Sequence, residues 1–178
     1  MKIVIIRHGK VNYSWNKWYT SEGFDRACSG YDAAPIKDEC YSVPDLEYQN
    51  IIISGLSRSY DTAKNLHTNG RLKKTDLINE VPVKSSVDSK LKLPLLLWYF
   101  SGRLQWIFNS SRQPEGRRQT IKRAKHFVKI LSKENKDCPV VTHGFFMHTL
   151  LSEMRKAGFA VSKSRLYYKN GEYVVAEK

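Results

Sequence analysis

Three short apolar runs along the chain predict buried strands. They are rich in isoleucine and valine and cover residues 2–6, 50–54 and 139–142. Unbroken runs of β-branched residues are typical of strands that are covered on both faces, as in parallel sheets. A further strand is predicted over residues 75–83, where apolar positions such as Leu77 and Val81 alternate with polar ones.

Helical patterns separate these strands. In residues 117–135, apolar side chains recur at the spacing of one helix face, namely Ile121, Ala124, Val128 and Leu131. The other two predicted helices are residues 56–69, ending at Gly70, and residues 145–158.

The segment 12–48 is long and mixed in pattern. We expect helical turns in it, followed by a loop around Ser29-Gly30 and Pro35, because glycine and proline commonly mark the breaks between elements.

The alternation of strands and helices sets the expected fold class. Residues 165–168 and 172–176 flank Asn170-Gly171, a pair that favours the tight turn of an antiparallel hairpin. We therefore expect an α/β protein, a three-layer sandwich with a mostly parallel central sheet flanked by helices and an antiparallel edge hairpin. The length of 178 residues and the lack of a linker predict a single domain over residues 1–178.

Net charge, apolar segments and cysteine content narrow the possible ligands and the expected cellular compartment. The formal net charge is +13, and basic residues cluster between Arg112 and Lys125, which fits an anionic ligand, a nucleic acid or a solvated helix face. The longest apolar candidate, residues 93–108, is interrupted by polar residues, and Met1-Lys2 leads directly into a strand, so we expect no membrane partner and no signal peptide. Three cysteines without zinc-like spacing favour a reduced, cytoplasmic protein.

Two tripeptides follow predicted strands and carry chemistry. Arg7-His8-Gly9 follows the first strand, and Thr142-His143-Gly144 ends the strand before the last predicted helix. Open α/β sheets deliver functional groups to one rim in this way. Two histidines and an arginine at that rim would suit a phosphoryl group.

Four segments in order resemble the histidine phosphatase superfamily, whose fold is phosphoglycerate mutase-like. Besides the two tripeptides, they are the segment from Ser54 through Arg58 to Thr62-Ala63, and the Leu77-Ile78-Asn79-Glu80 segment. The resemblance spans most of the chain. It implies a phosphomonoester phosphatase that acts through a phosphohistidine, without a metal or cofactor.

The resemblance also implies roles for individual residues. His8 would be the nucleophile, its tautomer fixed by a backbone carbonyl such as that of Gly9. Arg7, Arg58 and His143 would bind the phosphoryl oxygens. Glu80 would be the general acid for the leaving alcohol, with Glu115 as a weaker alternative.

Departures from the family affect the expected substrate. Where mutases of the family carry Glu and Asn, this chain has Lys10 and Ser14, which are candidate substrate-binding residues. These changes and the short chain favour a phosphatase over a mutase. Residues 98–106 either line the substrate pocket or pack an aromatic helix face on the core.

Alternative functions remain at this point. They are phosphoglycerate mutase-type phosphoryl transfer, and a basic module that binds anions or nucleic acid. The basic helix offers only Phe127 for base stacking, so nucleic acid is disfavoured. The expected partner is a small phosphorylated molecule, with a phosphoprotein as a further candidate; His67, His126 and His148 are assigned no role.

Overall fold

A six-stranded sheet forms the centre of the protein. The computed structural model describes residues 1–39, 41, 44, 48–66 and 70–178. The strand order is β4-β3-β6-β1-β8-β7. The bounds are β1 Lys2–Arg7, β3 Asn50–Ser54, β4 Arg71–Thr75, β6 Cys138–Thr142, β7 Ala160–Val161 and β8 Tyr173–Glu177. The first four of these run parallel, whereas β8 is antiparallel to β1 and β7 to β8.

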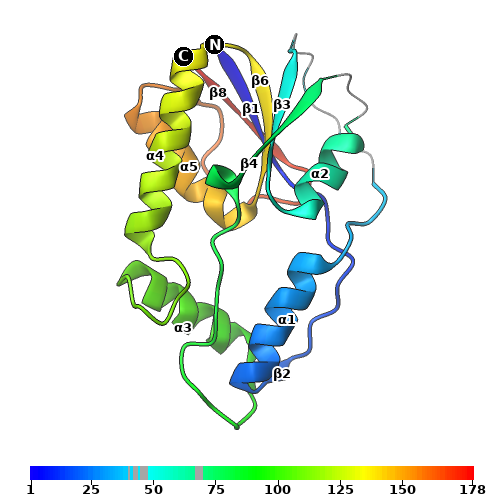
Figure 1. Ribbon diagram of the computed structural model, residues 1–178, viewed down its shortest axis with the longest axis vertical. Helices are drawn as coiled ribbons and strands as arrows, with labels where there is room; N and C mark the ends of the chain where they lie inside the picture. The colour runs from blue at the N-terminus through cyan, green and yellow to red at the C-terminus, as the bar shows by residue number, and fades with distance from the viewer. Residues whose placement is uncertain (40, 42–43, 45–47, 67–69) are drawn as a thin grey trace.

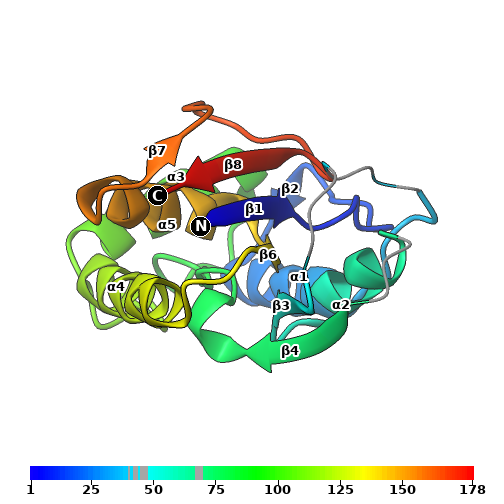
Figure 2. The same cartoon turned by 90° about the horizontal axis from the view of Figure 1, so that it is seen from above.

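Helices cover both faces of this sheet, which confirms the expected three-layer α/β fold. Figure 2 shows α4 (Arg117–Glu134) and α5 (Gly144–Lys156) on one side of the sheet and α2 (Ser57–Lys64) on the other. Alternate residues of β1 enter the two cores: Ile5 packs with the α4–α5 layer and Ile6 with the α2 layer. Because both faces are covered, these strands are unbroken apolar runs.

A separate group of elements lies beyond the carboxyl ends of the parallel strands, outside the three-layer sandwich, and is called the second layer below. It consists of α1 (Ser21–Ala33), α3 (Leu95–Ile107) and a two-stranded sheet of β2 (Trp18–Tyr19) and β5 (Leu93–Pro94). Figure 1 shows this layer at the end of the molecule opposite the chain termini. Phe24 and Trp98 are fully buried at its centre. No helix among the described residues is long and apolar enough to cross a bilayer.

The prediction of a strand over residues 75–83 is wrong in its position. The strand is β4, which ends at Thr75, and a 3-10 helix, η1 (Asp76–Ile78), follows it. The Thr75 hydroxyl accepts the Leu77 N–H and begins that turn. Pairing with β3 sets the register, and β4 is an edge strand with exposed lysines, so it has no apolar pattern. Glu80 therefore lies in a loop.

Two further expectations need correction. Ser29-Gly30 is not a loop but part of α1, which begins where the Thr20 hydroxyl accepts the Gly23 N–H. Residues 165–168 form no strand; β8 pairs instead with β7. Asn170-Gly171 does form a turn, with Gly171 at φ +74°, and its backbone bonds to β1 at Arg7.

The expected helices are observed with small shifts at their ends. The helix expected over residues 56–69 is described as α2, Ser57–Lys64, and residues 67–69, with His67, lie outside the described residues, as does Cys40. Residues 98–106 belong to α3, where Trp98 and Trp106 are buried in the core.

Candidate active site

The two histidines predicted from the motifs lie side by side. Parallel pairing of β1 with β6 aligns Arg7 with Thr142, so both strands end at the same rim. The His8 N–H donates to the Thr142 carbonyl at 2.9 Å. The His8 and His143 ring centroids are 5.0 Å apart, with the rings inclined at 51°.

The His8 side chain is held as a neutral imidazole. Its Nδ1–H donates to the Gly9 carbonyl at 2.7 Å, which leaves the lone pair on Nε2. Burial, then the charge of Arg58, lowers the pKa of His8 to about 3, with a smaller effect of Arg7. No hydrogen bond among the described residues involves Nε2. The ring therefore presents an unprotonated nitrogen at physiological pH.

His143 uses both of its ring nitrogens within the protein. Nδ1 accepts the Nε–H of Arg58 at 3.2 Å, and Nε2 donates to the Ser54 hydroxyl at 2.6 Å. The Ser54 hydroxyl in turn donates to Ser59 at 2.8 Å. Burial lowers the pKa of His143 well below its usual value, and His8 and the nearby arginines add to the shift. The ring of His143 is thus buried and neutral, and it is hydrogen-bonded to Arg58 and Ser54.

Arg58 connects His143 to helix α1. Its side chain is buried, and its Nη1 donates to the Asp32 carboxylate at 2.8 Å. The Tyr31 ring lies 5.3 Å from the guanidinium carbon. The Thr62 hydroxyl donates to the Arg58 carbonyl and accepts the Gly9 N–H at 2.8 Å, which ties α2 to the loop after β1.

Arg7 lies against the first residue of α5. Its Nη1 donates to the Tyr168 carbonyl, and the Tyr167 ring lies 5.0 Å from its guanidinium carbon. Its Nε is buried without a hydrogen-bond partner among the described residues. A Cβ at Gly144 would lie 2.8 Å from this Nε, so the glycine allows the arginine to approach.

The Glu80 carboxylate occupies the N-terminus of α5. It accepts the Phe146 N–H at 2.9 Å and the Phe145 N–H at 3.2 Å, and the N–H of Val81 at 2.9 Å. An acidic group is stabilised there by free N–H groups and the helix dipole. Because α5 starts next to His143, this arrangement places Glu80 at the rim that carries the histidines.

Arg7, Arg58 and Glu80 line a cavity of about 970 Å³ between the sheet and the second layer, whereas His8 and His143 do not line it. The ionisable side chains that line it include the basic Arg7, Arg58, Lys84, Arg103, Arg123 and His148 and the acidic Asp25, Asp32, Asp76, Glu80 and Glu115. Trp15, Tyr31 and Tyr99 form an aromatic wall. His8 and His143 are almost completely buried, and Arg58, which does line the cavity, is hydrogen-bonded to His143.

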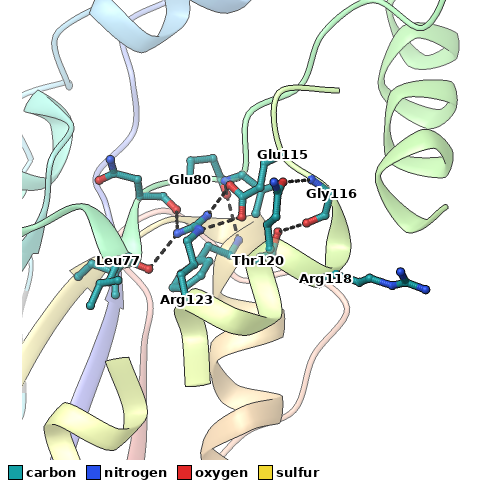
Figure 3. Close-up of polar contacts among 12 residues, drawn as sticks. Leu77, Glu80, Glu115, Gly116, Arg118, Thr120 and Arg123 are labelled. Carbon is teal, nitrogen blue, oxygen red and sulfur yellow. Dashed lines mark hydrogen bonds and ion pairs between the residues drawn. The ribbon is translucent and has the colours of Figure 1, made fainter. Parts of the chain in front are cut away.

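Arg123 fixes the loop that carries Glu80. Its Nη1 donates to the Leu77 carbonyl at 2.9 Å and the Asn79 carbonyl at 2.7 Å. Its Nε and Nη2 bind the Glu115 carboxylate at 2.8 and 3.1 Å, an ion pair that is largely buried. Figure 3 shows Arg123 between Leu77 and Glu115, with Glu80 next to the pair.

The structure places the remaining predicted residues apart from the cavity. Ser14 is exposed, and Lys10 is exposed with its backbone bonded to Lys37 and Tyr41. Neither lines the cavity. Within the described ranges, no cluster of His, Cys, Asp and Glu has the arrangement of a metal site.

Sequence reasoning missed several cavity residues. Asp32 and His148 line the cavity but follow no motif, and Arg123 was noted only as part of a basic cluster, whereas Tyr99 and Arg103 fall in residues 98–106, for which pocket lining was one of the two expected roles. Arg103 donates to the Val81 carbonyl at 3.1 Å and lies 3.7 Å from the Phe145 ring centroid. Burial lowers the pKa of His148.

Comparison with known proteins identifies the fold. A scan against models of protein families and a search of curated protein sequences find no match. Among solved structures, an alpha-ribazole phosphatase from Shigella flexneri is similar over 98% of this chain and 89% of its own, with a TM-score of 0.61 and 14% identity. A mycobacterial glucosyl-3-phosphoglycerate phosphatase is similar over 98% and 88%, with a TM-score of 0.57 and 17% identity. A phosphoserine phosphatase mutant from Entamoeba histolytica, in complex with phosphoserine, is similar over 87% and 80%, with a TM-score of 0.50 and 15% identity.

These similar structures are histidine phosphatase superfamily members. The resemblance inferred from the four sequence segments is therefore confirmed at the level of the fold, which is the histidine phosphatase fold.

Proposed function

We propose that this protein is a phosphatase that hydrolyses phosphomonoesters through a phosphohistidine on Nε2 of His8, without a metal ion. The observation that carries the proposal is the state of the His8 ring. The Gly9 carbonyl fixes its Nδ1–H, and its pKa of about 3 leaves Nε2 unprotonated beside two arginines. A neutral imidazole with a free lone pair is a competent nucleophile toward phosphorus.

Arg7 and Arg58 supply positive charge where the phosphoryl group would lie. Charge-assisted bonds from guanidinium groups stabilise the oxygens of a transferring phosphoryl group. The unpartnered Nε of Arg7 supports this role, because a buried guanidinium N–H without an acceptor favours an anion. Arg58 would exchange its Asp32 contact for a phosphoryl oxygen.

His143 would join them once the anion is bound. In the free protein its Nδ1 accepts from Arg58. A bound dianion raises the pKa of a neighbouring imidazole, so Nδ1 gains a proton and becomes a donor to a phosphoryl oxygen. The Ser54 contact to Nε2 would hold the ring in place throughout.

The reaction has two steps. The first step needs Glu80 as the carboxylic acid: Nε2 of His8 forms a bond to phosphorus, the ester P–O bond breaks, the leaving alcohol oxygen takes the Glu80 proton, and Glu80 is left as the carboxylate. In the second, water transfers a proton to Glu80 and attacks phosphorus, the P–N bond breaks, and neutral His8 and inorganic phosphate result. Glu80 is the proposed acid because it lies at the same rim and lines the cavity, whereas Glu115 is engaged by Arg123.

The cavity supports a small phosphorylated molecule as the substrate. Its volume of about 970 Å³ is within the range of small-molecule sites, and an aromatic wall suits an organic group attached to the phosphate. The phosphatases with the same fold are consistent with this substrate class.

A phosphatase assay on two substrates in EDTA tests the proposal. A nitrophenyl phosphate has a good leaving group, whereas an alkyl phosphate needs its oxygen protonated. We expect activity on both substrates with the chelator, loss of both in His8→Ala, and a Glu80→Gln variant that loses at least about tenfold more rate on the alkyl ester. Activity that disappears with EDTA, or that survives in His8→Ala, would contradict the proposal.

A further inference from the structure

Helix α3 exposes an apolar face that the proposed function does not use. We define the α3 outer face as Leu96, Leu97, Phe100, Leu104, Ile107 and Phe108, all of which are exposed. At about 100° per residue, these six positions fall within about 120° of the helix circumference. The buried residues of the helix, Trp98, Gly102 and Trp106, lie on the opposite side. Leu96 is 80% exposed and Phe108 77%, so the face is open to solvent along its whole length.

Other exposed apolar side chains lie at the same end of the molecule. Trp18 in β2 is 56% exposed, and its backbone pairs with Pro94, directly before α3. Leu91, in the segment before β5, is 74% exposed. Figure 1 shows β2, α3 and this connecting segment together at the end opposite the chain termini. A contiguous apolar surface with aromatic residues is uncommon on a soluble protein unless it contacts a partner.

Basic residues lie at both ends of this surface. Lys90 and Lys92 flank Leu91, and Lys17 precedes Trp18; all three lysines are exposed. At the other end of α3, the Arg118 N–H donates to the Asn109 side chain at 2.8 Å, so α4 begins next to Phe108. Figure 3 shows the Arg118 side chain extending away from the Glu115–Arg123 cluster.

Two exposed acidic groups nearby are in ion pairs, and Asp25 accepts hydrogen bonds from Ser85. Asp88 accepts two hydrogen bonds from the Arg112 guanidinium, and Glu22 in α1 pairs with Arg26. Therefore the net field at this end of the molecule is positive, as is the charge of the whole chain at +13.

We propose that the α3 outer face binds the surface of a bilayer that contains anionic lipids. Leucine and phenylalanine would insert at the headgroup boundary, and the flanking lysines and arginines would contact the lipid phosphates. This is a surface contact and not a span. It departs from the expectation of no membrane partner, which rested on the absence of a long apolar segment.

The charge pattern favours an anionic bilayer over two other binding partners of the α3 outer face, a second copy of the chain and a nucleic acid. A second copy of the chain packed face to face would bring Lys90 and Lys92 of each copy toward like charges. A nucleic acid would meet leucines, which offer no ring for stacking, at the centre of the surface. An anionic bilayer satisfies both the apolar centre and the basic ends.

Sedimentation with vesicles tests the proposal on the full chain. We expect binding to vesicles of phosphatidylcholine with 30% phosphatidylserine, which is about one lipid in three, and little to phosphatidylcholine alone. Raised salt should weaken the binding because it screens the basic residues. Failure to sediment with the phosphatidylserine vesicles, or equal binding to both compositions, would overturn the proposal.

Two pairs of variants identify the surface. Leu96→Gln with Phe100→Gln should weaken binding by roughly tenfold or more, whereas Tyr60→Gln, at an exposed position on α2, should not change it. Lys90→Gln with Lys92→Gln should weaken it by about 25-fold, at about fivefold per charge, in contrast to Lys73→Gln with Lys74→Gln on β4.

The outcome of these variants separates the occupants. All substituted side chains are exposed, so unfolding curves should match the parent. Binding that the Leu96–Phe100 variant leaves unchanged would refute the assignment to α3. If the parent protein does not bind vesicles but forms a concentration-dependent dimer, and the Leu96–Phe100 variant dissociates that dimer, the face would instead be assigned to a second copy of the chain. Hydrolysis of nitrophenyl phosphate is a separate readout, because these residues do not line the cavity.

Discussion

Arg58 bridges the buried imidazole of His143 and the partly exposed carboxylate of Asp32, with Nε 3.2 Å from Nδ1 of the ring and Nη1 2.8 Å from Oδ1. One guanidinium thus contacts both a base inside the core and an acid at the cavity wall. In the proposed reaction an incoming phosphate would compete with Asp32 for Arg58. Asp32 therefore becomes a determinant of anion affinity.

Removing the Asp32 charge should strengthen anion binding. In Asp32→Asn, Arg58 loses an ionic partner and the cavity loses a negative charge, so the inhibition constant for inorganic phosphate should fall about two- to fivefold, in keeping with a partly exposed ion pair. Competitive inhibition of nitrophenyl phosphate hydrolysis measures it. Glu22→Gln, on the solvent side of the same helix, is the matched control. Weaker inhibition in Asp32→Asn would mean that Asp32 holds Arg58 in its binding position.

A methyl group at position 144 should displace Arg7. The Cβ of Gly144→Ala would lie 2.8 Å from Nε and 3.0 Å from the guanidinium carbon of Arg7. Because alanine has a higher helix propensity than glycine, the substitution itself should not lower the free energy of unfolding through the backbone. We expect kcat/KM to fall by roughly tenfold, as measured by steady-state kinetics on nitrophenyl phosphate. An unchanged kcat/KM would exclude Arg7 from the phosphoryl site.

The Arg123–Glu115 pair should stabilise the loop that carries Glu80. Arg123→Met leaves a largely buried carboxylate and two backbone carbonyls without their donor, which should cost about 3 kcal/mol in the free energy of unfolding. Urea unfolding followed by circular dichroism measures it. Arg118→Met, five residues earlier on the same helix and extended away from the cluster in Figure 3, should change it by less than about 0.5 kcal/mol. Equal effects of the two variants would show that the pair contributes nothing specific.

Acid should destabilise the protein through its buried histidines. The pKa of His8 is about 3 in the folded state and 6.5 in the unfolded chain, so only the unfolded chain takes up this proton between those values. The stabilising contribution is complete above pH 6.5 and is lost as the pH falls toward 3, at up to about 1.4 kcal/mol per pH unit. Unfolding in urea at pH 7 and pH 5 measures the loss, which should be smaller by about 2 kcal/mol in His8→Asn. An identical pH dependence in that variant would contradict a buried neutral His8.

Strands covered on both faces were predictable from the sequence, and the edge strand was not. The cores on the two sides of β1 require an apolar residue at every position, so Ile3 to Ile6 form an unbroken run. In β4, Lys73 and Lys74 are exposed at an edge, and nothing in their local pattern distinguishes a strand from a loop.

The residues that directly follow a strand were predictable from the sequence pattern, whereas Arg58 and Glu80 were predicted from the family resemblance. His8 and His143 each come directly after a buried strand, so their place at the rim follows from the topology of a parallel sheet. Asp32 comes from α1 in the second layer, and its approach to the cavity depends on how that layer packs onto the sheet. No local pattern encodes such a contact.

Trapping the phosphoryl group tests the central claim most directly. The protein is mixed with labelled phosphomonoester, quenched within the turnover time, and digested for mass spectrometry. The account predicts a phosphoryl group on the peptide with His8 that is labile in acid and stable in alkali, and no such adduct in His8→Ala. A phosphoryl group on a serine, a cysteine or His143, or turnover without any adduct, would contradict it.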